Sequence, residues 1–260
     1  MAGALHLPSV AVHQSAEAHG TAKSVQLSAH LPANMQEKMQ HAKQVISVVA
    51  QQSRRAILFY SGGKDSIALL DLIAPHFDEI VLVFMYFVKG LEHIEQYLTW
   101  ASRTYPNVKV IQVPHWNLSY IRSAGVFCIP DPSVRILKLK DIDNAVRART
   151  GIEWSFLGFK QADSLNRRLM LKGYDKLAIS PTKKAYPLSV WNQADVMSYI
   201  STRNLPAPIS YTSGKKSHGV GFHEEVYLYL QEHYPNDLQK ILTEFPLSQK
   251  LLIDHAKRQK

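Results

Sequence analysis

Cysteine is almost absent from this sequence of 260 residues. The single one, Cys128, stands in the apolar stretch Val126-Phe127-Cys128-Ile129-Pro130. One cysteine excludes an intramolecular disulfide, a CxxC redox pair and a multi-cysteine site for zinc or an iron–sulfur cluster. A thiol in apolar surroundings is expected to be buried and inert. We therefore expect no zinc and no iron–sulfur cluster.

Long apolar runs are also absent, although hydrophobic residues make up 46% of the chain. No run reaches the length needed to span a membrane. The N-terminus lacks the basic region and apolar stretch of a signal peptide. These absences predict a cytoplasmic protein with no membrane partner, and the apolar content is ample for a core.

Acidic residues are fewer than basic ones, which gives a formal net charge of +9. The excess is local, because residues 135–184 hold twelve Lys and Arg but five Asp and Glu. Such a segment can face a bound polyphosphate, face a nucleic acid, or be solvated surface. A nucleic-acid partner is therefore one hypothesis among three.

A glycine-rich turn stands between an apolar run, 56–60, and a segment with helical spacing, 67–73. A strand, a glycine turn and a helix N-terminus together make an anion site, because backbone N–H groups converge there. Glycines permit backbone angles that other residues avoid. The expected phosphate-binding residues are Ser61, Gly62, Gly63, Lys64, Asp65 and Ser66. Among them, the Asp65 carboxylate is a candidate ligand for Mg²⁺.

Apolar strand-like runs alternate with helix-length segments along the chain. Strands are expected at 56–60, 79–85, 108–113 and 154–157, and helices at 34–52, 66–75 and 91–104. This alternation predicts an α/β fold, a doubly wound, mostly parallel sheet. Ligands of such sheets bind at the carboxyl ends of the strands. Ser61 and Gly158 should therefore lie at the same edge, with the excursion 114–152 near it.

A second motif, residues 157–168, follows the fourth expected strand. Gly158 permits a close approach of backbone to ligand, and Lys160 is expected to point a cation beyond the strand. Asp163 or Ser164 can cap the next helix. One turn later, Arg167 and Arg168 offer guanidinium groups for phosphate. The alternative is a strand–turn–helix with a basic solvent face.

The string Ser-Gly-Gly-Lys-Asp-Ser at 61–66 resembles the PP-loop of the ATP pyrophosphatase superfamily. It is not a Walker A loop, which needs glycine where Leu58 stands and Ser or Thr where Asp65 stands. Residues 158–167 resemble the Gly-x-Arg-x-x-x-Ser-x-x-Arg motif of phosphoadenosine phosphosulfate (PAPS) reductases, with Lys160 replacing the first Arg. Residues 186–200 resemble a third motif of that family. Over residues 56–222 the chain is identified as a member of the PAPS reductase-like family, of the phage and mobile-element type.

This resemblance implies an adenine nucleotide α-hydrolase-like fold that uses ATP and Mg²⁺. The implied reaction cleaves ATP to AMP and pyrophosphate and adenylates an unknown acceptor, with Lys64, Asp65, Lys160 and Arg167 as catalytic residues. Gly158, Ser164 and Arg168 join residues 61–66 in nucleotide binding. One alternative is a sulfonucleotide-binding protein that works with a partner thiol. Another is a non-catalytic nucleotide-sensing or nucleic-acid-binding module.

Two departures from the family pattern limit the implied activity. The family's C-terminal Glu-Cys-Gly-x-His segment has no counterpart, since no cysteine follows Cys128. A thiolate nucleophile cannot be replaced by His or Ser, so the standard cysteine-dependent reductase reaction is not expected. The second strand also ends Phe84-Met85-Tyr86-Phe87, without the carboxylate that the reductases have there.

Three regions are expected along the chain. Residues 1–33 form an irregular arm, residues 34–205 the nucleotide-binding domain, and residues 206–260 a lid-like loop with C-terminal helices. The lid is placed at Gly214–Gly221 and the helices at 223–233 and 236–258. The C-terminal helices form a packing or dimerisation appendage, so we expect a homo-oligomer, a dimer.

Overall fold

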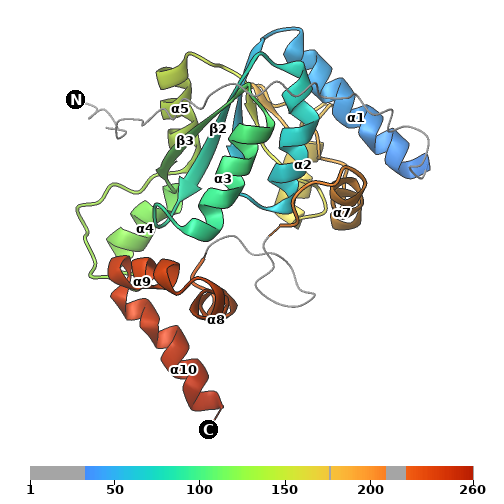
Figure 1. Cartoon of the computed structure of the whole chain (residues 1–260). Coiled ribbons are helices and arrows are strands. Elements are labelled where there is room, and N and C mark those ends of the chain that lie inside the picture. The colour runs from blue at the N-terminus through green and yellow to red at the C-terminus, as the bar shows by residue number, and fades with distance from the viewer. Residues whose placement is uncertain (1–32, 176, 209–220, 260) are drawn as a thin grey trace.

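A five-stranded parallel sheet forms the centre of the computed structural model, which describes residues 33–175, 177–208 and 221–259 (Figure 1). The strand order is β3-β2-β1-β4-β5, and every paired strand is parallel. The strands are β1 (Arg55–Tyr60), β2 (Glu79–Tyr86), β3 (Val108–Pro114), β4 (Ser155–Phe156) and β5 (Lys184–Ala185). The predicted α/β class and parallel sheet are confirmed, although β5 was not expected.

Helices cover both faces of this sheet and continue beyond it at the C-terminal end. They are α1 (Ala33–Ala50), α2 (Lys64–Ile73), α3 (Glu92–Thr104), α4 (Trp116–Ala124), α5 (Leu139–Thr150), α6 (Leu165–Lys172), α7 (Gln193–Thr202), α8 (Glu224–His233), α9 (Pro235–Glu244) and α10 (Lys250–Arg258). The excursion 114–152 thus contains α4 and α5. Within the described ranges, no helix is long and apolar enough to cross a membrane.

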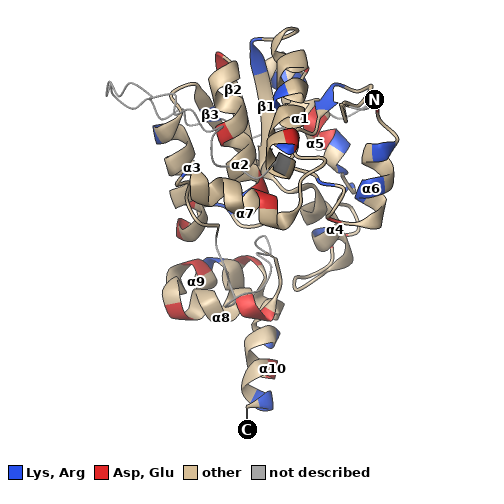
Figure 2. Ribbon diagram, turned by 90° about the vertical axis from the view of Figure 1, so that its right-hand side faces the viewer, with Lys and Arg blue, Asp and Glu red and all other residues tan. Residues whose placement is uncertain are grey.

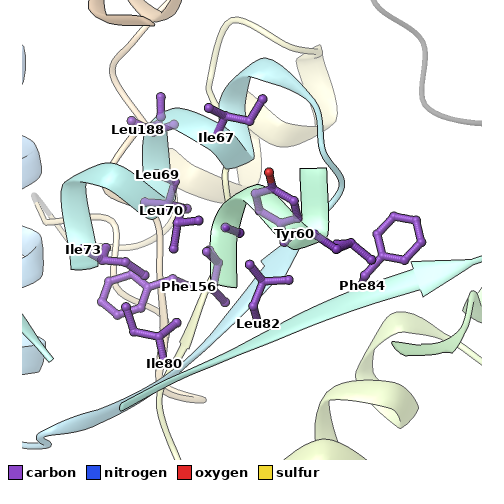
Figure 3. Packing of buried hydrophobic residues seen from close by; sticks show 14 of the residues in the cluster. Tyr60, Ile67, Leu69, Leu70, Ile73, Ile80, Leu82, Phe84, Phe156 and Leu188 are labelled. Carbon is purple, nitrogen blue, oxygen red and sulfur yellow. The ribbon is translucent and has the colours of Figure 1, made fainter. Parts of the chain in front are cut away.

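Alternate side chains of β1 build two separate cores. Leu58 faces a cluster that includes residues of α1, α2 and α7, whereas Ile57 faces a cluster with α5 and α6. Figure 3 shows the first of these, where Leu69 and Leu70 of α2 lie over Leu82 of β2. Because β1 is apolar on both faces, it is held in the middle of the sheet.

The C-terminal segment is broken where one helix was expected. Pro246 follows Phe245, and a 3₁₀ turn, Pro246–Gln249, separates α9 from α10. Proline cannot continue a helix because it lacks an N–H and its ring clashes with the preceding turn. Figure 1 shows α8, α9 and α10 on the side toward which β2 and β3 point.

Several expected features fall outside the described residues. They are the arm at 1–32 and nearly all of the lid at 214–221. The three-part division of the chain therefore stays a prediction. Within the described part, Val226 and Leu230 of α8 belong to the same buried cluster as α1 and α2, so α8 shares a core with the sheet.

Candidate functional site

The glycine loop, residues 61–66, is closed by its own hydrogen bonds. Ser61 N–H donates to Ser66 Oγ at 3.2 Å, and the Ser66 hydroxyl donates to the Gly63 carbonyl at 2.9 Å. Gly62 has φ +72, a left-handed angle that strains a residue with a side chain. Gly63 then caps α2, whose first N–H groups lack helical acceptors. The loop therefore presents a preorganised helix N-terminus at the carboxyl end of β1.

The second motif lies against this loop. Strand β4 pairs with β1 in the register Ile57–Ser155 and Leu58–Phe156, so Gly158 reaches the edge where β1 ends. A β-carbon at position 158 would lie 3.3 Å from Cβ of Asp65, closer than most such contacts. The prediction that Ser61 and Gly158 share one edge is confirmed.

Lys160 is placed differently from the expectation of a free cation. Its side chain is 2% exposed, and Nζ lies 2.7 Å from Asp65 Oδ2 and 2.8 Å from Asp163 Oδ1. Burial alone would raise the pKa of Asp163, but hydrogen bonds from Lys160 and Arg167 hold it below its ordinary value. Lys160 therefore joins the two motifs by pairing with one carboxylate from each. A bound phosphate would interact with the Lys160 charge only indirectly, because these two carboxylates partly neutralise it.

Arg167 is the more accessible cation of the second motif. Its guanidinium donates to Asp163 Oδ2 at 2.6 Å, lies 4.1 Å from the centre of the Phe159 ring, and is 41% exposed. The Ser164 hydroxyl caps α6 by accepting the Arg167 N–H at 3.2 Å, as the sequence indicated. Stacking and pairing hold the guanidinium in one orientation while leaving part of it open to a ligand.

Arg168 and Lys64 complete the set of cations expected at the site. Arg168 Nε donates to the Gln161 carbonyl at 3.3 Å, so this side chain bends back over its own motif. Lys64 Nζ lies 3.3 Å from Asp65 Oδ2, and its side chain is 17% exposed. The two residues thus belong to the two motifs that the Asp65–Lys160 pair joins.

Asp163 and Phe159 are the residues whose role the sequence analysis missed. Asp163 was considered only as a helix cap, yet it pairs with both Lys160 and Arg167. The spacing held a signal, because residues three and four apart meet on one side of a helical turn. Phe159 gave no comparable signal. Its ring supports the Arg167 guanidinium by stacking, and that contact depends on a side-chain position that the sequence does not show.

The expectation of Mg²⁺ on Asp65 is wrong for this arrangement. Oδ2 of Asp65 already lies beside the ammonium groups of Lys64 and Lys160. In the described part of the chain, no three His, Cys, Asp or Glu residues are grouped so that they could hold a metal ion. Mg²⁺ at nucleotide sites is usually held by one or two carboxylates with waters and substrate phosphates, and here the one carboxylate of the loop is already paired with two ammonium groups.

Aromatic rings occupy the edge where β2 ends without a carboxylate. His115, just after β3, stacks on Phe87 with ring centres 4.5 Å apart. Its Nδ1 accepts the Asn117 N–H at 3.1 Å, which caps α4. Burial lowers the pKa of His115 to about 4. The ring is therefore neutral at pH 7, with its proton on Nε2.

Cys128 lies in the core, as its surroundings indicated. It is 7% exposed, and its Sγ donates to the Ile121 carbonyl at 3.7 Å. Thiol reactivity requires an accessible thiolate. In the part of the chain that the structure describes, the Cys128 thiol is too buried to react in this way.

Comparisons with known proteins bear on this geometry. Residues 55–220 match the model of the family described as the phosphoadenosine phosphosulfate reductase domain. No curated protein matches the sequence significantly. Among solved structures, the Candida glabrata FMN adenylyltransferase in complex with FMN and the ATP analogue AMPCPP is 15% identical. Its TM-score is 0.51, and the match covers 75% of this chain and 67% of that one.

Two further structures have TM-scores below 0.5. The phosphate complex of the Candida auris PAPS reductase is 14% identical with a TM-score of 0.48, over 74% of this chain and 97% of that one. The U34-tRNA thiolase of Methanococcus maripaludis with its [4Fe-4S] cluster is 14% identical with a TM-score of 0.47, over 84% and 78%. Such low identities show likeness of fold alone.

The expected cofactor set, ATP and Mg²⁺ without zinc or an iron–sulfur cluster, is contradicted in its metal part. The residues described here provide no group for the predicted Mg²⁺. The contact between the glycine loop and the second motif does not depend on the identity of any cofactor.

Proposed function

Because the chain belongs to the phosphoadenosine phosphosulfate reductase domain family, we propose that it binds an adenine nucleotide with its phosphates on residues 61–66. The observation that carries the proposal is the contact of Gly158 with Asp65, which brings the loop and the basic motif together. The proposed reaction is attack by an acceptor on the α-phosphorus of ATP. The α–β phosphoanhydride bond breaks, pyrophosphate leaves, and the acceptor carries AMP.

The role proposed for each residue depends on whether its polar group can reach a bound nucleotide. The N–H groups of Gly62 and of the first turn of α2 donate to phosphate oxygens, and Lys64 pairs with the leaving pyrophosphate. Arg167 neutralises charge on the transferring phosphoryl group. Lys160 is a positioning residue, because it acts through Asp65 and Asp163. No protein nucleophile is required, since positioning and charge stabilisation carry phosphoryl transfers.

A second candidate is favoured by the family match itself. The chain would then bind a sulfonucleotide and receive a thiol from another molecule, since Cys128 is buried. The two candidates share the phosphate site and differ in product. Pyrophosphate release from ATP supports the first, and sulfite release from PAPS with an added dithiol supports the second.

Calorimetric titration of Lys64→Ala tests the shared phosphate site. Loss of a charged hydrogen bond costs about 1.5–3 kcal/mol, so ATP and PAPS should bind about 10- to 100-fold more weakly. The matched control is Lys43→Ala, because Lys43 is an exposed cation of α1 with no ion pair to any described residue. Equal affinities of Lys64→Ala and wild type for both nucleotides would contradict the proposal.

A further inference from the structure

Helices α5 and α6 form one layer over the sheet. Ile142 and Val146 of α5 and Leu171 of α6 belong to a single buried cluster with Ile57 of β1. Figure 2 shows the two helices as neighbours on the same side of the molecule, with Lys and Arg on both. Cations of both helices therefore lie on one side of the molecule.

Only part of the basic segment 135–184 is available on that surface. Five of its cations lie in ion pairs with carboxylates: Arg147, Lys160, Arg167, Lys183 and Lys184. Six others are exposed and form no ion pair with any described residue. We call these six the basic face: Arg135, Lys138, Lys140, Arg149, Arg168 and Lys172.

Most carboxylates of the same segment are already engaged. Asp143 is 1% exposed and lies between Arg147, Ser155 and Lys184. Asp141 accepts the Lys138 N–H at the start of α5. Glu153 pairs with Lys183, Asp163 with Lys160 and Arg167, and Asp175 accepts the Leu177 N–H. Asp143, Glu153 and Asp163 are thus offset by their own cations. Asp141 and Asp175 keep their negative charges because N–H donors are neutral, so the six cations of the basic face outnumber these two carboxylates.

We infer that the basic face binds the phosphodiester backbone of a nucleic acid. Phosphate contacts need dispersed, exposed cations without a buried apolar centre. The exposed positions of α5 are Lys140, Asn144, Ala148 and Arg149, so its outer surface has no large apolar residue. Large apolar residues, which protein interfaces and membrane surfaces need, are exposed at Ile136, before α5, and at Leu165 and Leu169 of α6. The phosphate contacts are therefore assigned first to the outer side of α5. Lys140 and Arg149 lie about 13 Å apart along α5 and about 180° apart around its axis, so a bound strand would cross the helix and not follow it.

The face also leads toward the nucleotide site. Arg168 and Lys172 lie on α6, whose first turn carries Arg167 and is capped by Ser164. A strand bound across α5 and α6 would therefore reach the open side of Arg167. That the strand is the acceptor rests on the proposed function, whereas its binding to the basic face does not.

Fluorescence anisotropy with labelled 20-nucleotide RNA, single-stranded DNA and duplex DNA tests the binding. Each neutralised phosphate contributes about 0.7–0.9 to the slope of log K against log salt, so four or five contacts give a slope of about −3 to −4. The variant Lys138→Glu, Lys140→Glu, Arg149→Glu and Lys172→Glu should bind at least about 100-fold more weakly in low salt. The three probes show whether one kind of strand is preferred.

A charge-matched control carries Lys43→Glu, Lys89→Glu, Arg103→Glu and Lys257→Glu, because these residues are exposed and unpaired elsewhere on the described chain. It should keep most of the affinity. Equal loss in both variants would overturn the inference, since net charge alone would explain it. Failure to bind any probe in low salt, or equal competition by polyglutamate or anionic vesicles, would also overturn it.

Nucleotide calorimetry on the same two variants keeps this inference separate from the proposed function. All eight substituted side chains are exposed and lie outside the glycine loop. ATP affinity should therefore be unchanged in both. A protein that binds ATP but no nucleic acid would lack the basic-face interaction and retain the phosphate site.

Discussion

Buried carboxylates meet several donors at once in this protein. Asp71, on α2, is 5% exposed and accepts from Tyr105, Tyr199 and Arg203 at 2.6–3.1 Å. Asp143, which is 1% exposed, shows the same pattern with other partners, and the more exposed Asp163 also meets two cations. A charge removed from water is tolerated when hydrogen bonds and an opposite charge compensate for lost hydration. Asp71 therefore fixes α2, and with it the glycine loop, against α7.

Asp71→Asn should lower the free energy of unfolding at pH 7 by about 3 kcal/mol, since Arg203 loses its buried partner. Urea denaturation measures the change. Burial raises the pKa of Asp71, but Arg203 and the two tyrosines lower it more, so the net pKa is depressed. The stabilisation is thus present above the ordinary value near 3.9 and fades as pH falls through the lower folded pKa.

The difference between wild type and Asp71→Asn should accordingly shrink below about pH 4. Asp254→Asn serves as the matched control, because Asp254 forms an exposed pair with Lys250. Exposed pairs contribute about 0–1 kcal/mol, so this variant should stay near wild type. A difference for Asp71→Asn that is independent of pH would show that lost packing, and not lost charge, is responsible.

The sequence predicted contacts between residues that are close along the chain, and it did not predict contacts between residues that are far apart along it. Ser164 caps α6 because a Ser before a helix bonds to an N–H three residues on. Lys160 was expected to be free because its partner Asp65 comes from a different strand end. Sequence spacing holds no information on that pairing until the order of strands is known.

Among secondary structure elements, helix ends with local caps are the best determined. Asn192 accepts the Asp195 N–H at 3.0 Å and Asp195 accepts the Asn192 N–H at 2.6 Å, a reciprocal capping box at the start of α7. Asp195 also pairs with Lys38 of α1 at 2.7 Å. One short segment therefore both starts α7 and fastens it to α1.

Asn192→Ala should destabilise the protein by about 1 kcal/mol, the usual cost of losing an N-cap side chain. Chemical denaturation measures the loss. Asn192→Ser is the matched control, since serine is an equally good cap and should retain most of the stability. If both substitutions cost the same, the effect comes from another contact of the amide group.

Strands and helices were predictable in proportion to their length and pattern. The apolar run of β2 was found within one residue, because a buried parallel strand is apolar throughout. Strand β5 has two residues, Lys184–Ala185, and no periodicity. The break between α9 and α10 was missed although Pro246 marks it.

At the scale of the whole molecule, one buried side chain links the C-terminal helices to the sheet layer. Asp237 of α9 accepts the N–H groups of Glu92 and His93 at 2.8 and 3.0 Å, and lies 2.7 Å from His93 Nδ1. It therefore occupies the N-terminus of α3 as a cap supplied from far along the chain. Packing of α8 into the main core adds to this link.

Asp237→Ala should free these donors and loosen α9 and α10 from the body of the protein. We expect the free energy of unfolding to fall by about 2–4 kcal/mol, as for a buried charge-assisted contact. Limited trypsin digestion should cut first at Lys240 and Lys250. Asn236→Ala, at an exposed neighbour on α9, is the control and should change little. Digestion indistinguishable from wild type would contradict this role of Asp237.

The Asp65–Lys160 pair can form only late in synthesis of the chain. Asp65 leaves the ribosome early, while Lys160 follows only after β2, β3, α4 and α5. Contacts between segments distant in sequence form late, because the intervening chain must first give up its freedom. A nascent chain that ends before β4 therefore has its loop but lacks the cation that fixes Asp65. Nucleotide affinity should thus arise in a single step, when emerging chains pass residue 160, and growing chains of defined length could be assayed for it.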